Sequence, residues 1–502
     1  MTAQAAIPSG GKLAVNALIY GLATVLSRAA SLIMLPVYTR LLTPADYGLL
    51  HFLDLMVEVA VILCSAGMTM GVLRFYFKAE TTQARNEVLV SAFVLQLGLD
   101  LVATVLVVAA AVPISNNAMG GAATPGMIAL AGVNITIGSL AIVPLLKMQA
   151  DQRATAYVAV SLAKLLLQLG LNLLFLIGLK MGPIGILWSN FASSLVVGVG
   201  MSIWMLRDTG MKVTRPALRD LRRFGVPYQF MAAGSFILAF GDRFVLEPVA
   251  GLAVVGIYSL AYQFGMLGSA VAAAPFLRAW NPIRFEQVTT PLPERDAAAD
   301  RGFRHLNLVT VSFAVGVALF VRPLLMVMSD PAFHGAVVLV PVILFAYQLQ
   351  TWTEAARFGI DASEQTRYAS YAVWVSAVVC IALYFVLIPP FGAMGAAVAT
   401  VLAFWVRFHL TYRWAQRLFP IGYRWGPTVR LTVLAALVVI PVVTFPPASL
   451  ALAVGAGTIG ALVYVLVGWR FVVVGEDRAW IRHAVTAAPL AFLRRIGVAR
   501  AA

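Results

Sequence analysis

The feature that most constrains this chain is a series of apolar runs, each long enough to cross a lipid bilayer. A membrane-spanning helix needs roughly 20 predominantly apolar residues, and about 14 such runs follow one another along the sequence. They show no alternation of apolar and polar residues, so the sequence predicts helices rather than a closed barrel. The runs cover residues 14–38, 47–70, 88–113, 126–146, 155–179, 183–206, 225–246, 252–276, 305–328, 336–356, 368–388, 393–414, 427–445 and 449–472.

The composition agrees with a membrane protein. The chain is 61% hydrophobic and 11% charged, whereas soluble domains are about 45–50% apolar and about 25% charged. The first run is too long for the core of a signal peptide and no clear cleavage site follows it, so we predict a retained first span. Cys64 and Cys380 both lie in predicted spans without metal-type spacing, which predicts neither a disulfide nor a metal site.

The positive charges predict the orientation of the chain. If the N-terminus is cytoplasmic, the inner connections and the tail hold 30 of the 36 Lys and Arg residues. Cytoplasmic loops carry such an excess, so both termini are predicted to be cytoplasmic, and the net charge of +15 needs no nucleic-acid partner. The outer connections hold Arg40, Lys180, Arg243 and Arg322. Arg28 and Lys164 lie inside predicted spans.

An internal repeat predicts two similar halves. "GPIGILWSN" begins at Gly182 and "GAMGAAVAT" begins at Gly392, an offset of 210 residues, and Arg40 and Arg243 correspond more loosely at an offset of 203. Two six-helix lobes that enter from the same side form a parallel repeat around a central cavity, as in transporters. The predicted parts are an N-terminus (1–13), an N-lobe (14–206), a linker (207–224), a C-lobe (225–417), two further helices (427–472) and a basic tail (473–502).

Several motifs occur in a fixed order: "LPVYTRLLTPADYGLL", "GVLRFYFKAE", "LRRFGVPYQF" and "GDRFVLEPVAGLAVVGIYSLAYQFG". With the helix count, they make the chain resemble, over essentially its whole length, the polysaccharide (O-antigen type) flippases of the MOP exporter superfamily, which are related to lipid II flippases and MATE exporters. The resemblance implies export of an undecaprenyl-diphosphate-linked oligosaccharide to the outer leaflet of a bacterial inner membrane by alternating access. It implies no cofactor, coupling to H⁺ or Na⁺, and polysaccharide polymerase or assembly proteins as partners.

Charged residues inside the predicted spans are the first candidates for substrate contacts, because a charge at mid-membrane is costly and usually faces a cavity. Arg28 and Lys164 are the cations of this kind, and we predict that they hold the diphosphate or acidic sugars. The Ser27-Arg28 pair matches, in type and position, a pair that faces the cavity in lipid II flippases. The alternative is structural pairing with Asp54, Glu58 or Asp100.

Two further groups of charged residues are candidates. Arg74 and Arg278 end spans two and eight on the inner side, where they are predicted either to meet the lipid diphosphate first or to act as plain topological anchors. Asp54 and Glu58 share one face of span two, and Asp100 lies in the middle of span three. These three carboxylates are predicted to couple transport to H⁺ or Na⁺, with charge pairing as the alternative. Glu354 and Arg357 are expected to form a local ion pair.

Other functional classes fit less well. An ATP-driven exporter would need a phosphate-binding loop, but Gly10, Gly11 and Lys12 are followed by Leu13. Neither His-Glu-x-x-His nor Gly-x-Ser-x-Gly occurs, and a membrane glycosyltransferase or polymerase would need carboxylates on the sparsely charged outer side. The sequence therefore predicts a transporter and not an enzyme. A lipid II flippase and a MATE-type drug exporter remain alternatives.

Overall fold

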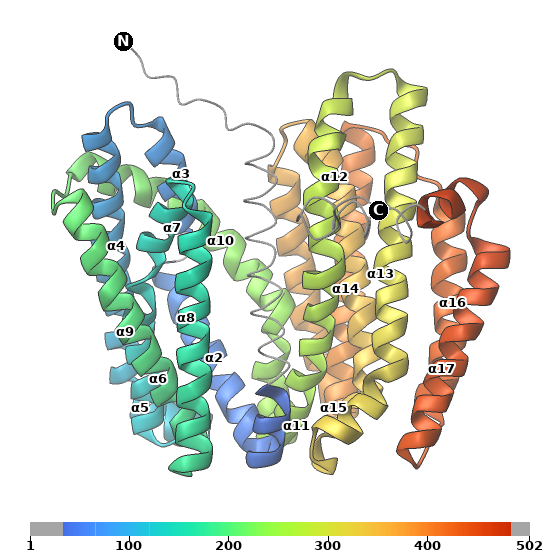
Figure 1. Ribbon diagram of the computed structural model, residues 1–502, viewed down its shortest axis with the longest axis horizontal. Helices are drawn as coiled ribbons and strands as arrows, with labels where there is room; N and C mark the ends of the chain where they lie inside the picture. The colour runs from blue at the N-terminus through green and yellow to red at the C-terminus, as the bar shows by residue number, and fades with distance from the viewer. Residues whose placement is uncertain (1–33, 66, 120, 483–502) are drawn as a thin grey trace, which may run out of the picture. The chain divides into compact units, whose positions relative to one another are not determined.

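The computed structural model describes residues 34–65, 67–119 and 121–482 (Figure 1). Within these residues every regular element is helical. The long helices are α2 (Pro44–Cys64), α3 (Met68–Lys78), α4 (Thr82–Ala109), α6 (Pro125–Ser139), α7 (Ile142–Ala150), α8 (Ala154–Leu173), α9 (Pro183–Thr209), α10 (Arg215–Phe240), α11 (Asp242–Gly268), α12 (Ala274–Glu286), α13 (Leu292–Met328), α14 (Ala336–Ala362), α15 (Arg367–Leu418), α16 (Trp425–Thr444) and α17 (Leu450–Val467). The short ones are α5 (Ala111–Pro113), η1 (Ile114–Ala118), η2 (Leu174–Gly178), η3 (Ser269–Ala273), η4 (Gln287–Thr289), η5 (Pro331–Phe333) and η6 (Gly468–Val472).

The helices confirm the predicted fold class. In the described part of the chain, 11 helical stretches are long and apolar enough to cross a bilayer. Two of them, Arg215–Thr289 and Arg367–Leu418, each contain two of the predicted spans. The first predicted span, 14–38, lies mostly outside the described residues. The chain is an all-α polytopic membrane protein.

Glycines mark the points where the continuous helices turn. Helix α15 has 52 residues and would be about 78 Å long if it were straight, far more than the roughly 30 Å of the hydrocarbon core. The backbone at Gly392 leaves the helical region, with φ 54° and ψ −131°, and Gly251 does the same inside α11 with φ 80° and ψ 168°. Gly182, before α9, has nearly the conformation of Gly392, with φ 63° and ψ −147°. This agreement supports their pairing in the repeat.

The described residues belong to two compact units. The first runs as far as Ser259 and also contains residues 328–332 and 377–396; the second contains residues 260–327, 333–376 and 397–482. The boundaries expected from the sequence for the lobes, the linker and the tail stay predictions.

The core of the first unit lies where α2, α4, α6 and α9 pack side by side (Figure 1). Buried side chains such as Phe52, Leu53 and Ile128 fill it. Helices α2 and α11 approach most closely at two glycines. A Cβ atom on Gly48 would lie 1.9 Å from the carbonyl oxygen of Leu252, and one on Gly256 would lie 2.0 Å from that of Pro44. Small residues allow such close helix contacts in membranes.

The second unit is held together by a similar use of small residues and by buried polar contacts. A Cβ atom on Gly302 of α13 would lie 2.2 Å from the indole nitrogen of Trp280 on α12. The amide oxygen of Asn307 accepts hydrogen bonds from Gln348 Nε2 at 3.1 Å and from Trp352 Nε1 at 2.6 Å. These bonds join α13 to α14 and satisfy polar groups that would be costly to leave unpaired in a low-dielectric interior.

Candidate transport site

Helix α2 carries two of the predicted coupling residues on one face. The helix begins with a capping box, in which Thr43 Oγ1 accepts from the Asp46 N–H and Asp46 Oδ2 accepts from the Thr43 N–H. Asp54 and Glu58, four residues apart, are both exposed. His51 lies on the same face, one turn before Asp54, and is half-buried. Within the described residues, neither carboxylate has a hydrogen-bond or ion-pair partner. The structure therefore does not contain the alternative pairing of these carboxylates with Lys164.

Asp100 lies in a very different environment on α4. Its side chain is buried, with 1% of the residue exposed. Gln96 Nε2, one helical turn earlier, donates a hydrogen bond to Asp100 Oδ2 at 2.7 Å. The other carboxylate oxygen, Oδ1, has no partner in the described part of the chain. Buried carboxylate oxygens are normally satisfied, so a proton or a small cation at Oδ1 would supply a missing partner.

The predicted cations within the spans are only partly placed. Lys164 lies on α8, is half-buried, and forms no hydrogen bond or ion pair with any described residue. No described carboxylate therefore competes with a phosphate for this side chain. Arg28 lies outside the described residues, so the structure does not test whether the two cations come together.

Arg74 and Arg278 belong to different units. Arg74 of α3 is exposed, and its guanidinium lies 4.7 Å from the centre of the Phe224 ring on α10, a cation–π contact that leaves the N–H groups available. Arg278 is exposed on α12. Both positions suit either prediction made for them.

One buried charged cluster was not anticipated from the sequence. Asp242 and Arg243 stand at the start of α11 with 0% and 3% of their surface exposed, although Arg243 was assigned to an outer connection. Arg243 Nη1 lies 2.7 Å from Asp242 Oδ1, and the Tyr258 hydroxyl donates to Asp242 Oδ2 at 2.5 Å. The signal was present in the sequence: adjacent opposite charges in an otherwise apolar segment indicate a self-neutralising pair.

A second unanticipated group lies in the other unit, at the ends of α12 and α14. Arg284 is buried between the rings of Trp280 and Phe358, at 4.3 and 4.5 Å, and its Nη1 donates to the Ala355 carbonyl at 2.8 Å. Its Nε has no partner among the described residues. Its Nη2 also donates to the amide oxygen of Asn281. This guanidinium is therefore balanced by aromatic faces, an amide oxygen and a carbonyl rather than by a carboxylate in direct contact.

The neighbouring ion pairs correct one prediction. Arg357 Nε lies 3.3 Å from Asp361 Oδ1, and Glu354 Oε1 lies 3.7 Å from Arg407 Nη2 on α15. The expected pair between Glu354 and Arg357 does not form, because each finds another partner, one a full helical turn away and one on a different helix.

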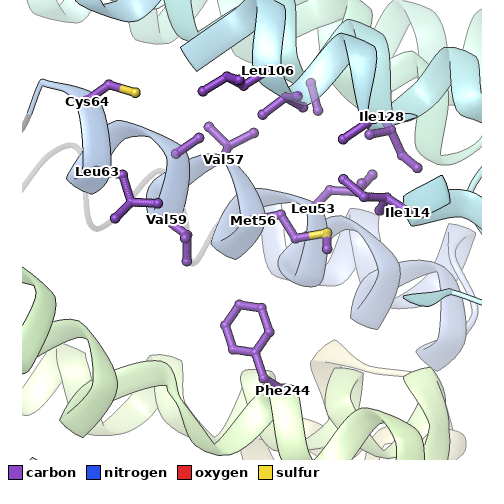
Figure 2. Close-up of a pocket in the computed structure, with 14 residues that line it drawn as sticks. Leu53, Met56, Val57, Val59, Leu63, Cys64, Leu106, Ile114, Ile128 and Phe244 are labelled. Atoms are coloured by element: carbon purple, nitrogen blue, oxygen red, sulfur yellow. The ribbon is translucent and has the colours of Figure 1, made fainter. Parts of the chain in front are cut away.

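The first unit also contains an apolar pocket of about 270 Å³. Figure 2 shows it around α2, with Val57 and Leu106 on one side of the helix and Phe244 approaching from the other. Its lining comes from α2, α4, η1, α6, Ala110 and Phe244, and Asp54 and Glu58 are not part of it. One spanning helix thus carries two carboxylates and also lines an apolar pocket.

The second unit has a larger apolar pocket of about 440 Å³ between α13, α14, α15 and α16. The polar residues in its lining are Gln348 and Thr432. The side chain of Gln348 already donates a hydrogen bond to Asn307. Pockets with so few polar groups suit hydrocarbon chains rather than sugars or phosphates.

Comparison with known proteins gives one family and one fold. Residues 13–287 match the model of the family described as "Polysaccharide biosynthesis protein". No curated protein matches the chain. Among solved structures, lipid II flippase MurJ in an inward closed conformation is 12% identical, with 90% of this chain and 99% of that chain covered and a TM-score of 0.70.

Two further structures share the fold. An inward-facing multidrug resistance MATE family transporter of the MOP superfamily is 17% identical, with 79% of this chain and 97% of that chain covered and a TM-score of 0.61. A MOP superfamily transporter from Pyrococcus furiosus, whose binding pocket is described as having reverse polarity, is 16% identical, with 81% and 94% covered and a TM-score of 0.54.

Proposed function

Since the chain belongs to the polysaccharide biosynthesis protein family, we propose that it is a flippase for lipid-linked oligosaccharide. It moves an undecaprenyl-diphosphate-linked unit from the inner to the outer leaflet of a bacterial inner membrane, with both of its termini cytoplasmic. The movement follows alternating access and supplies surface polysaccharide synthesis, and no covalent bond is made or broken. Polymerase and assembly proteins would receive the product.

One observation carries this proposal: the same spanning helix has charged and apolar features next to each other. Helix α2 lines the 270 Å³ apolar pocket with residues such as Leu53 and Val57, while Asp54 and Glu58 lie exposed on the same helix. An amphiphile with a hydrocarbon tail and a charged head needs both kinds of environment during a crossing. The tail would use the apolar pockets, the anionic head group would contact cationic side chains, and the carboxylates of α2 would bind the coupling ion.

The residues proposed to contact the diphosphate are Arg28, Lys164, Arg74 and Arg278. An unpaired cation such as Lys164 offsets the cost of bringing a phosphate into a low-dielectric region. The gradient-coupling residues are proposed to be Asp54, Glu58 and Asp100. Asp100 is the strongest candidate of the three, because its buried Oδ1 has no partner in the described chain. We propose that the coupling ion binds at this oxygen.

The proposal is tested with single charge replacements. Lys164→Gln, Arg28→Ala and Arg28→Lys are expressed in cells that lack the native protein, after folded protein in the membrane is confirmed. Surface polymer and lipid-linked precursor in the inner leaflet are then measured. Lys180→Gln is the matched control, because Lys180 is exposed beyond the end of α8.

Loss of Lys164 or Arg28 is expected to reduce export by roughly tenfold or more, because a hydrogen bond to a charged group contributes about 1.5–3 kcal/mol. The precursor should then accumulate, and Arg28→Lys should restore part of the export. Normal export in every variant would remove these residues from the transport path. Cells without the protein that still export the polymer normally would refute the proposed function.

A second candidate function follows from the exposed carboxylates of α2. Asp54 and Glu58 have no partner among the described residues, and an acidic surface in a spanning helix would suit a cationic drug. Efflux of a fluorescent cationic dye from cells that carry the protein, abolished by Asp54→Asn, would favour a MATE-type exporter. Accumulation of lipid II in the knockout would instead favour a lipid II flippase.

A further inference from the structure

The first half of α10 carries an arginine stripe, which we define as Arg215, Arg219, Arg222 and Arg223. Residues spaced by three, four and seven positions lie on one side of a helix, and all four arginines are exposed. The opposite side of the helix is packed into the protein. Leu221 has 0% of its surface exposed and belongs to a core cluster with residues of α3, α4 and α9.

Helix α3 packs against the side of α10 that faces away from the arginine stripe. A Cβ atom on Gly71 of α3 would lie 3.3 Å from the side chains of Leu221 and Phe224, so α3 and α10 are in direct contact. This contact places the Arg74 guanidinium 4.7 Å from the Phe224 ring. Arg74 is thereby held on the opposite side of α10 and is not a member of the stripe.

The arginine stripe is not neutralised by the protein itself. Within the described part of residues 34–482, neither the four arginines of the stripe nor Arg74 form an ion pair. Lys212, just before the helix, does have a partner, Glu87 Oε1 at 2.6 Å. The nearby Asp220 is exposed and pairs with no described residue. A row of guanidinium groups without carboxylate partners is available to bind oxygen anions from outside the protein.

We infer that the arginine stripe binds the phosphate head groups of anionic phospholipids. The stripe covers nine residues, and its ends lie about 12 Å apart along the helix axis. This distance is longer than a single diphosphate and matches several separate head groups. Clusters of four or more basic residues next to a spanning helix are recognised in this way by anionic lipids. Beyond Pro227, α10 continues into the apolar segment that spans the membrane.

This inference rests on the proposed function in one respect, the orientation of the chain. The proposed function places residues 215–223 at the cytoplasmic leaflet. Head-group binding would hold the first half of α10 at the membrane surface. Because α3 packs on the same part of α10, the bound lipids would also fix the position of Arg74. The chemistry of the contact is that of a phosphate, so the test has to separate bulk phospholipid from a lipid-linked diphosphate.

The experiment uses the full chain in two variants that change the net charge equally. The stripe variant is R215Q/R219Q/R222Q/R223Q. The control variant is R367Q/R413Q/R417Q/R430Q, which removes four exposed arginines of the second unit, three from the two ends of α15 and one from α16. Each protein is purified in detergent with phosphatidylglycerol or phosphatidylcholine, and the retained lipids are counted by native mass spectrometry. A parallel series titrates farnesyl diphosphate as a competitor.

The expected result is that the original protein retains several phosphatidylglycerol molecules and that the stripe variant binds them on the order of tenfold more weakly. The control variant should bind them as the original protein does, and farnesyl diphosphate should not displace them stoichiometrically. Equal binding by the stripe variant, or an equal loss in both variants, would overturn the inference. Full displacement by one farnesyl diphosphate would assign the stripe to the transported substrate instead. Normal lipid retention by a protein that fails to flip would refute only the proposed function.

Discussion

Two arginine-rich regions of the molecule use the same side chain in opposite ways. The arginine stripe of α10 has no carboxylate partner among the described residues, whereas the start of α13 holds what we call the Asp300 clamp, built from Asp300, Arg304, His305, Arg424 and Asp477. Arg304 binds Asp300 and lies 3.0 Å from Asp477, and Arg424 Nη2 lies 2.7 Å from Asp300. His305 Nε2 lies 3.2 Å from Asp477.

The difference lies in burial and in the number of nearby carboxylates. The side chains of Arg304 and Asp300 are 3% and 2% exposed, so each needs the other to balance a charge taken out of water. In the second unit, guanidinium groups thus join α13, the α15–α16 connection and the segment after η6. In the first unit, those of the arginine stripe remain on the surface without a carboxylate partner among the described residues.

The largest effect is expected from breaking the Asp300 clamp at its centre. Asp300→Asn leaves Arg304 and Arg424 with less charge compensation, and removing one partner of a buried pair costs about 3–5 kcal/mol. The thermal unfolding midpoint in detergent measures this loss. Asp296→Asn is the control, because Asp296 is 34% exposed beside Arg295 and should cost less than about 1 kcal/mol. Equal midpoints for both variants would contradict the assignment of the clamp.

A smaller effect is expected when acid acts on the other carboxylate of the clamp. Burial alone would raise the pKa of Asp477, but hydrogen bonds and charges from His305 and Arg304 outweigh it and hold the pKa below its ordinary value. The folded state therefore binds this proton less readily than the unfolded chain. Its stabilising contribution is complete above about pH 4 and is lost as the pH falls through the lowered pKa.

This prediction is checked by measuring unfolding midpoints between about pH 3 and pH 7. The original protein should lose stability steeply at the acid end, and Asp477→Asn should start lower and show a flatter profile. Parallel profiles for the two proteins would mean that Asp477 does not carry the acid sensitivity of the clamp.

A modest effect is expected from His305. Its ring stacks on that of Trp480 with 4.1 Å between the centres and 10° between the planes. His305→Phe keeps the stacking and removes the hydrogen bond to Asp477, which should cost about 1 kcal/mol. Differential scanning fluorimetry can resolve such a change. A loss as large as that of Asp300→Asn would show that His305, rather than Asp300, is the centre of the clamp.

The smallest effect on stability is expected in the arginine stripe. R222Q/R223Q should change the free energy of unfolding by less than about 0.5 kcal/mol, because exposed side chains without partners contribute little. The same variant should nevertheless weaken the retention of phosphatidylglycerol. A large destabilisation would show that these arginines hold the protein together, and the contrast with the clamp would disappear.

The sequence predicted the helical architecture well because the bilayer leaves few choices. Apolar runs of spanning length have to become helices, and glycine marked the turns at Gly251 and Gly392. Individual charges inside spans, such as Asp100 and Lys164, could also be found, since they interrupt apolar runs. The division of the chain into lobes and the role of Arg28 stay predictions.

The pairing of charges that lie far apart in the chain could not be read from the sequence. Asp300 and Arg424 are 124 residues apart, and only the packing of α13 against the α15–α16 connection brings them together. Glu354 shows the same limit. Its spacing from Arg357 predicted a local ion pair, whereas the packing of the helices places it beside Arg407. The burial of Arg243 was also not predicted, because the charge count placed this residue in an outer connection.

The glycine turn at Gly392 has a consequence for how the chain can be handled. Because a single residue separates the two helical segments of α15, the connection offers no extended stretch that a protease could cleave or that could accept an inserted tag. Digestion from that side would leave α15 intact whatever the orientation of the protein. The topology at this position therefore has to be mapped with small reagents on single introduced cysteines rather than with enzymes or fusion reporters.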